Sequence, residues 1–211
     1  MISKRKLLKK SRLYAILDKK IAANSSILKI AKQIVNCGVD IIQLRDKVSK
    51  KEEIIRESLV LRKLLLNSRA LFIINDCLEI AKIVDSDGIH IGQEDLSIKL
   101  ARKILGKDKI IGISCHSLKQ AVEAQSKGAD YISIGPVFPT PVKPEYKPVG
   151  LGLIKKIKAR IKIPFFAIGH INQFNIDSVI SMGARRVAVC RGIIGANNIP
   201  VAIKVIKRKL E

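Results

Sequence analysis

Charged and polar side chains follow short apolar runs in this sequence, and their types suit the binding of a phosphorylated molecule. Gln43, Arg45 and Lys47 stand at the end of one such run. Arg binds two phosphate oxygens through its planar fork, and Lys supplies a compact positive charge. In a strand, Gln43 and Arg45 would share one face, with Lys47 just beyond it. We expect this segment to bind a diphosphate, although solvated loops often carry similar residues.

Two aspartates follow the next two apolar runs. Asn75 and Asp76 end one run, and Asp95 comes shortly after the other. Carboxylates beside cations suggest a Mg²⁺ site that water and phosphate oxygens complete. The alternative is that Asp76 and Asp95 only cap the helices that follow them. A shared metal requires the two side chains to lie within about 10 Å of each other, at the same end of the fold as Arg45.

Further polar residues follow the later apolar runs. Ser114 opens a helical segment, where its hydroxyl and the helix N–H groups suit a phosphate. A proline-rich stretch then predicts a stiff loop that exposes Thr140 and Lys143. His170 and Arg191 follow the last two runs, and the loops after the last two strands are the usual phosphate site of an α/β barrel.

Three nearby residues have no clear chemical role in the sequence. His90 falls inside an apolar run, which favours a hydrogen-bonded interior histidine over a catalytic one. No catalytic triad can be drawn through Cys115 or His116. We interpret Cys115 as a packing residue and leave the role of His116 open.

The elements that must position these residues alternate regularly along the chain. Eight short apolar runs, rich in Ile and Val, predict buried parallel strands at 13–17, 40–44, 71–74, 88–91, 110–113, 131–134, 164–168 and 186–189. Segments with helical spacing predict helices at 26–37, 50–67, 78–84, 97–105, 118–127, 151–159, 175–182 and 201–210.

Helix ends carry the expected residues. Asp95 or Ser97 is the predicted N-cap of one helix and Ser117 that of another. Gly38, Gly128 and Gly183 are predicted left-handed residues just past three helices. The alternation has no break in composition, and no G-x-G-x-x-G follows the first strand. We therefore predict an α/β protein with one domain over 1–211, folded as a (β/α)₈ barrel whose function lies at the carboxyl ends of the strands.

The charge balance is strongly basic. Of 211 residues, 40 are Lys or Arg and 18 are Asp or Glu, so the formal net charge is +22. Such a charge attracts polyanions, including nucleic acid. The basic residues are spread along the chain, however, which favours a solvated surface, and we do not expect nucleic acid as a partner. Only residues 1–11 form a concentrated basic extension, predicted to be a frayed tail before the first strand.

The setting of the protein follows from what the sequence lacks. No apolar run approaches the length of a membrane span, and no secretory signal opens the chain. The four cysteines show no metal-finger spacing and fit a reducing compartment. We expect a cytoplasmic protein whose partners are small molecules and which has no membrane partner.

Five motifs resemble those of the thiamine-phosphate synthase family, which shares a superfamily with the thiazole tautomerase. They are QLRDK at 43–47, IND at 74–76, GIHIGQED at 88–95, GIS at 112–114 and GPVFPT at 135–140. The likeness runs in order from about Leu13 to Arg191. It implies a (β/α)₈ transferase that joins 4-amino-2-methyl-5-hydroxymethylpyrimidine diphosphate to a thiazole phosphate and releases pyrophosphate.

The resemblance also implies roles for individual residues. Asp76 and Asp95 would hold Mg²⁺. The catalytic cations would be Arg45, Lys47 and Lys143. The residues implied to contact the pyrimidine diphosphate are Gln43, Arg45, Lys47, Asn75, Ser114 and Lys143. The residues placed near the thiazole phosphate are Thr140, Pro141, Val142, His170, Cys190 and Arg191.

These residue types suit the route proposed for the family, which is dissociative. The diphosphate leaves, a pyrimidine methylene cation forms, and the thiazole nitrogen captures it. This step needs positive charge where the leaving group becomes more negative, and it needs two rings held in attack geometry. It needs no protein nucleophile, which agrees with the missing triad.

Three positions depart from the family pattern, all where the thiazole phosphate should lie. Val142 stands where a Ser or Thr is usual, and Gly169-His170 replaces a Gly pair. Arg191 stands where a small polar residue such as Ser is usual. Our hypothesis is that Arg191, with His170, binds the phosphate by direct charge pairing. The alternatives are a different acceptor or a site that has lost activity.

Three other functions remain as alternatives. The thiazole tautomerase is expected to carry a His where this chain has Pro136, and that difference, with Lys143, favours the synthase. A barrel that binds nucleic acid would show salt-sensitive affinity for generic DNA or RNA, but it leaves the paired carboxylates unexplained. A non-catalytic barrel that binds a phosphorylated ligand is the third alternative.

Overall fold

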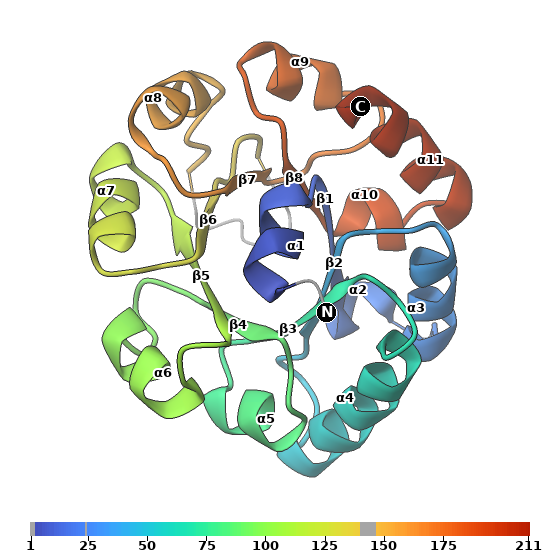
Figure 1. Cartoon of the computed structure of the whole chain (residues 1–211). Helices are drawn as coiled ribbons and strands as arrows, with labels where there is room; N and C mark the ends of the chain where they lie inside the picture. Colours follow the sequence, from blue (N-terminus) through green and yellow to red (C-terminus); the bar gives the residue numbers. More distant parts are fainter. Residues whose placement is uncertain (1–2, 24, 140–146) are drawn as a thin grey trace.

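Eight parallel strands, paired in sequence order, close into a barrel in which β8 lies beside β1 (Figure 1). This computed structural model describes residues 3–23, 25–139 and 147–211. The strands are β1 (Leu13–Asp18), β2 (Ile41–Arg45), β3 (Leu71–Asn75), β4 (Gly88–Ile91), β5 (Ile110–Cys115), β6 (Tyr131–Ile134), β7 (Phe165–Ile168) and β8 (Val187–Val189). Each overlaps a predicted strand, so the predicted (β/α)₈ barrel is confirmed.

Most helices surround the barrel and cover the outer faces of its strands, whereas α1 (Lys4–Lys10) lies across one end (Figure 1). The others are α2 (Lys19–Ala22), α3 (Ile27–Asn36), α4 (Lys51–Leu65), α5 (Leu78–Ile83), α6 (Ile98–Leu105), α7 (Leu118–Ser126), α8 (Gly152–Arg160), α9 (Ile176–Ser181), α10 (Arg191–Ile194) and α11 (Ile199–Leu210). The eight predicted helices correspond to α3–α9 and α11. The four-residue helices α2 and α10 are too short to show a helical period in the sequence.

Local chemistry explains where several helices begin and end. The hydroxyls of Ser97 and Ser117 accept hydrogen bonds from Leu100 N and Gln120 N, each at 3.2 Å, as predicted for N-caps. The glycines predicted to be left-handed also have positive φ: 65° at Gly38, 87° at Gly128 and 97° at Gly183.

The strands divide the core into two regions. Ile42 and Leu44 of β2 pack outward against the helices, whereas Ile41 belongs to a cluster inside the barrel. Aromatic rings fill much of that interior: Phe166 lies edge-on to Tyr131, with ring centroids 5.6 Å apart. A glycine makes room for this packing, since a Cβ added to Gly112 would lie 2.0 Å from Tyr131 Cζ.

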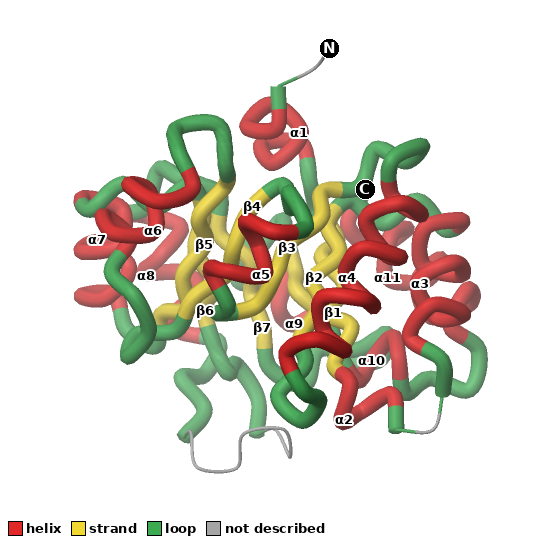
Figure 2. The backbone as a smooth tube through the Cα atoms, turned by 90° about the horizontal axis from the view of Figure 1, so that it is seen from below, coloured by secondary structure: helices red, strands yellow, loops and turns green. Residues whose placement is uncertain are grey.

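Helix α1 corrects the expectation of a frayed basic tail. It lies across one end of the barrel (Figure 1), opposite the end that carries α2 and α10 (Figure 2). Leu8 is only 2% exposed and packs into the interior cluster. Arg5 forms a 2.8 Å ion pair with Asp130, and Lys4 forms one of 3.2 Å with Asp87. These acidic partners come from distant segments, so the local pattern of residues 1–11 could not indicate them.

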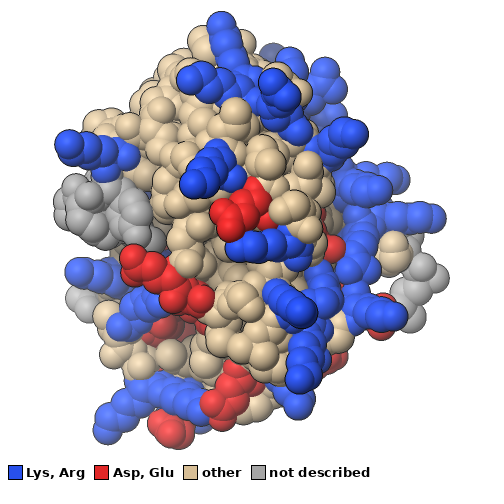
Figure 3. All heavy atoms as spheres, turned by 90° about the vertical axis from the view of Figure 1, so that its left-hand side faces the viewer, with Lys and Arg blue, Asp and Glu red and all other residues tan. Residues whose placement is uncertain are grey.

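The remaining basic residues agree with a solvated surface. On the face shown in Figure 3, Lys and Arg side chains spread over many elements, with Asp and Glu between them. Within the described ranges, no helix combines the length and the apolar character needed to cross a membrane.

We predict that Leu8→Ala lowers the free energy of unfolding by about 2–4 kcal/mol, because it leaves a cavity between α1 and the barrel interior. Urea denaturation followed by circular dichroism measures this change. Lys6→Ala is the matched control, since Lys6 is exposed on the same helix and should change stability by no more than about 0.5 kcal/mol. Equal stabilities for the two variants would show that the packing of Leu8 into the barrel interior does not stabilise the protein.

Candidate active site

The carboxyl ends of the eight strands meet at the end of the barrel opposite α1 (Figure 2). Two adjoining cavities open there, of about 390 Å³ and about 600 Å³. The smaller is lined mainly by residues that follow β2–β5, and the larger mainly by residues that follow β5–β8. Arg45, Ser114 and His116 line both cavities and therefore mark their boundary.

The smaller cavity brings together the aspartates predicted to bind metal. Asp76 and Asp95 both line it, together with Arg45 and Lys47, and Lys47 forms an ion pair with Asp76. Burial raises the pKa of Asp76, Lys47 opposes that rise, and the neighbouring Asp95 adds to it. Since both carboxylates line one small cavity, a divalent cation there would relieve their repulsion. Binding of Mg²⁺ stays a prediction.

The structure does not support the alternative that these aspartates merely cap helices. The N-cap of α5 is Cys77, and the N-cap of α6 is Ser97. Asp76 instead has a positive φ of 56°, and its N–H donates to His90 O at 2.8 Å. Asp95 accepts a 2.6 Å hydrogen bond from Gly92 N. Asp76 therefore adopts an uncommon backbone conformation at the point where its side chain enters the cavity.

The donor set fits a magnesium ion better than a metal held only by protein. Among the described residues, no group of three or more His, Cys, Asp or Glu side chains is placed to hold a metal. Mg²⁺ commonly binds one or two carboxylates and keeps water and phosphate oxygens in its other positions. Asp76 and Asp95 match that pattern.

Arg45 is held by a residue absent from the predicted site. Asp18, at the end of β1, is 1% exposed and forms an ion pair with Arg45. Its other carboxylate oxygen accepts from Ile21 N at 3.1 Å, which caps α2. The predicted strand ends at Leu17, one residue before the end of β1, and therefore leaves Asp18 out of the predicted site. The signal was available, since Asp18 is the first polar residue after an apolar run, as in the other site segments.

A chain of buried hydrogen bonds crosses the barrel interior and ends at the cavities. Gln43 Nε2 donates to Tyr14 OH at 2.5 Å, and Tyr14 OH lies 3.0 Å from Tyr131 OH. Tyr131 OH lies 2.9 Å from His90 Nδ1, and His90 Nε2 lies 3.0 Å from Ser114 Oγ. His90 is thus the hydrogen-bonded interior histidine that was predicted. Gln43 is 2% exposed and lies within this network.

The network keeps neutral groups in place next to the boundary of the cavities. Burial raises the pKa of Tyr14 and Tyr131 far above that of an ordinary tyrosine, so both hydroxyls stay protonated. Neither tyrosine was predicted to belong to the site. Both fall inside apolar runs, where their types indicate packing rather than a polar role.

The thiols next to the cavities are poorly suited to act as nucleophiles. Burial raises the pKa of the Cys115 and Cys190 thiols to about 12, so thiolate is scarce at neutral pH. Cys115 is 1% exposed and belongs to the core, as expected. Cys190 lines the larger cavity at the end of β8.

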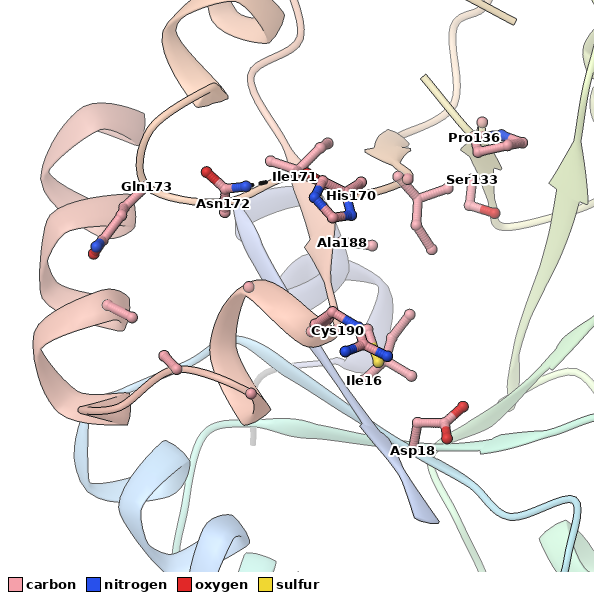
Figure 4. Close-up of a pocket in the computed structure, with 18 of the residues that line it drawn as sticks. Ile16, Asp18, Ser133, Pro136, His170, Ile171, Asn172, Gln173, Ala188 and Cys190 are labelled. Carbon is pink, nitrogen blue, oxygen red and sulfur yellow. Dashed lines mark hydrogen bonds between the residues drawn. The ribbon is translucent and has the colours of Figure 1, made fainter. Parts of the chain in front are cut away.

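The larger cavity lies between the barrel interior and the loop that follows β7. In Figure 4, Ile16, Ala188 and Cys190 come from the strand ends, whereas His170 and Gln173 come from the loop. His170 has a positive φ of 53° and is exposed. Its carbonyl oxygen accepts a 2.9 Å hydrogen bond from Asn175 Nδ2, which helps to hold this conformation.

Arg191 also lines the larger cavity, at the first position of α10, and its side chain is exposed. No ion pair joins it to any of the residues that the structure describes. The structure therefore places the two altered residues, His170 and Arg191, around one cavity. Four predicted site residues lie outside the described residues: Thr140, Pro141, Val142 and Lys143.

Comparison with known proteins adds a second line of evidence to the geometry of the site. A family model described as thiamine monophosphate synthase matches residues 13–193. A thiamine-phosphate synthase of Shouchella clausii is 40% identical over 205 residues, which is 97% of this chain and 98% of that protein. One of Halalkalibacterium halodurans is 42% identical over 201 residues, 95% of each chain.

Solved structures agree with these matches. A thiamine phosphate pyrophosphorylase from Pyrococcus furiosus superposes with a TM-score of 0.87 at 33% identity, covering 98% of this chain and 96% of that one. A 3-hexulose-6-phosphate synthase superposes with a TM-score of 0.67 at 18% identity, covering 95% of this chain and all of the other. The second likeness concerns the fold alone.

Proposed function

The chain belongs to the thiamine monophosphate synthase family, and from that premise we propose that it joins the pyrimidine diphosphate to the thiazole phosphate in the two cavities described above. The observation that carries this assignment is the pair of adjoining cavities. One collects carboxylates and cations suited to a diphosphate and its metal, and the other has an exposed arginine for a second phosphate. Their boundary is where the new carbon–nitrogen bond would form.

In this proposal the smaller cavity binds the leaving group. Arg45, oriented by Asp18, and Lys47, beside Asp76, supply positive charge to the diphosphate as its bond to carbon breaks. Asp76 and Asp95 would hold Mg²⁺, which when bound offsets negative charge on the departing pyrophosphate. Lys143 is proposed for the same role from the family resemblance.

The boundary residues orient the substrates. Ser114 lines both cavities, and the buried chain through Tyr131 and His90 fixes the direction of its hydroxyl. Bringing two rings into attack geometry is itself a large part of catalysis, because a bimolecular step becomes effectively unimolecular. The high pKa of both nearby thiols agrees with a dissociative route that uses no protein nucleophile.

The setting is part of the proposal. The partners are the two small substrates, and four free cysteines fit a cytoplasmic, reducing environment. Nucleic acid is not proposed as a partner.

Incubation of the purified protein with Mg²⁺ and both substrates should yield thiamine phosphate and pyrophosphate. Chromatography detects the first product, and a coupled pyrophosphatase assay detects the second. Omission of the thiazole phosphate is the control for simple diphosphate hydrolysis. If an active family member yields product under these conditions and this protein does not, the assignment is wrong.

Asp76→Asn should reduce turnover by at least about 100-fold, because an amide cannot replace the carboxylate charge that binds the metal. It should also weaken Mg²⁺ binding in the presence of pyrophosphate, measured by isothermal titration calorimetry. Asp108→Asn is the control, since Asp108 is an exposed aspartate in the turn before β5, away from both cavities. Normal turnover and Mg²⁺ affinity in Asp76→Asn would remove Asp76 from the metal site.

We also propose that Arg191 binds the acceptor phosphate in place of the small polar residue usual in the family. Arg191→Ser should then raise KM for the thiazole phosphate by about 10- to 100-fold, the usual effect of losing a hydrogen bond to a charged group. KM for the pyrimidine diphosphate should change little. Arg185→Ser is the matched control, because Arg185 is exposed just before β8 and Arg191 lies just after it. Steady-state kinetics that leave the acceptor KM of Arg191→Ser unchanged would exclude this role.

A further inference from the structure

Three of the residues that the structure describes line both cavities: Arg45, Ser114 and His116. Arg45 and Ser114 already have roles in the proposed reaction, and His116 does not. We propose that His116 is a positioning residue. It keeps the wall of the larger cavity, called the acceptor cavity below, aligned with the smaller one, called the diphosphate cavity. This inference rests on the proposed function and adds a specific role to it.

Hydrogen bonds fix His116 on both its backbone and its ring. The residue directly follows β5, and its backbone N–H donates to Gln120 Oε1 of α7 at 2.6 Å. Ring atom Nδ1 lies 2.5 Å from Gly135 O, beyond the end of β6. A carbonyl oxygen can only accept, so Nδ1 carries the hydrogen of this bond. One imidazole thus connects the ends of two neighbouring strands.

The position of Gly135 determines the position of the acceptor-cavity wall. Gly135 and Pro136 both line the larger cavity. A Cβ added to Gly135 would lie 2.2 Å from Ile168 O, and one added to Gly169 would lie 2.5 Å from Pro136 Cα. Val137 N also donates to Ile168 O at 2.8 Å. The segment after β6 therefore packs against the end of β7 without free space, and a shift of Gly135 must displace Gly169 as well.

Arg45 and Ser114 differ from Gly135 in what supports them. Arg45 and Ser114 belong to strands, whose ladder bonds hold them directly. Gly135 lies beyond β6, where its N–H donates to Cys115 O at 3.3 Å and its carbonyl accepts from the side chain of His116. Loss of the bond from His116 should leave the diphosphate cavity in place and displace the opposite wall. Small misplacements of one reactant reduce catalysis strongly.

Two substitutions of His116 distinguish the effect of its hydrogen bond to Gly135 O from the effect of its side-chain volume. In His116→Asn, the amide nitrogen can occupy the place of Nδ1 and donate to Gly135 O. In His116→Leu, the side chain keeps a similar volume but has no hydrogen-bond donor. We expect His116→Leu to raise KM for the thiazole phosphate about tenfold with a smaller change in KM for the pyrimidine diphosphate, and His116→Asn to restore most of the loss.

Gln125→Met is the matched control. Gln125 lies on α7, as does Gln120, and it binds backbone at the other end of the barrel. Its Oε1 accepts from Lys162 N at 2.7 Å and from Ile163 N at 3.2 Å. Its loss should lower the melting temperature without changing either KM. Melting temperatures of all variants report folding, and His116→Met, which also lacks a donor, replaces His116→Leu if the latter does not fold.

The outcomes distinguish this inference from the function on which it rests. An inactive wild-type protein would overturn the proposed function and the role of His116 together. An active wild type with unchanged acceptor KM in His116→Leu would overturn the role of His116 alone. Equal losses in the Asn and Leu variants would also overturn it, because the donor to Gly135 O would then not be the determining feature.

Discussion

The register of the eight parallel strands is the constraint on which the site depends. Along β2, Ile41, Gln43 and Arg45 face the barrel interior, while Ile42 and Leu44 pack against the helices. The interior face therefore changes from apolar at the α1 end to polar and then charged at the other. A slip of one residue would reverse every side chain and direct Arg45 into the helical layer. Burial of the aliphatic faces thus positions the charges of the site.

Pairing lets the barrel end hold several charges before substrate is present. Asp18 neutralises Arg45, and Asp76 neutralises Lys47, so neither cation is left uncompensated at the cavity walls. The pairs also determine direction, since Asp18 is itself fixed by its bond to Ile21 N. Below them, the network from Gln43 to Ser114 satisfies buried polar groups by hydrogen bonds alone. Polar groups inside an apolar barrel are tolerated only when they are satisfied in this way.

The sequence was sufficient to predict elements that carry their own local pattern of residues. It was insufficient for elements that are stabilised by residues far away in the chain. Every strand carries its own apolar run, and Ser97 and Ser117 carry the cap preference of their own helices, so these elements could be predicted. Helix α1 is short and basic and is stabilised by Asp87 and Asp130, more than 80 residues away. No local pattern encodes such contacts.

The site shows the same division. Arg45, Asp76 and Asp95 were found because each is a charged residue that follows an apolar run. Tyr14 and Tyr131 were missed because a polar tyrosine network inside a barrel cannot be told from aromatic packing until the strands are paired. Only the pairing places their hydroxyls 3.0 Å apart.

The larger cavity contains a histidine in a backbone conformation that glycine usually adopts. His170 stands where the resemblance indicates glycine, yet it keeps a positive φ of 53°, next to Gly169 at 114°. A left-handed conformation costs a residue with a Cβ about 1–2 kcal/mol, so surrounding contacts must impose it. The packing of Pro136 on Gly169 and the bond from Asn175 to His170 O supply those contacts. The backbone of the cavity therefore has a shape suited to glycine although it carries a histidine side chain. Under the proposed function, Arg191 would bind the acceptor phosphate by charge from a wall whose backbone is already fixed.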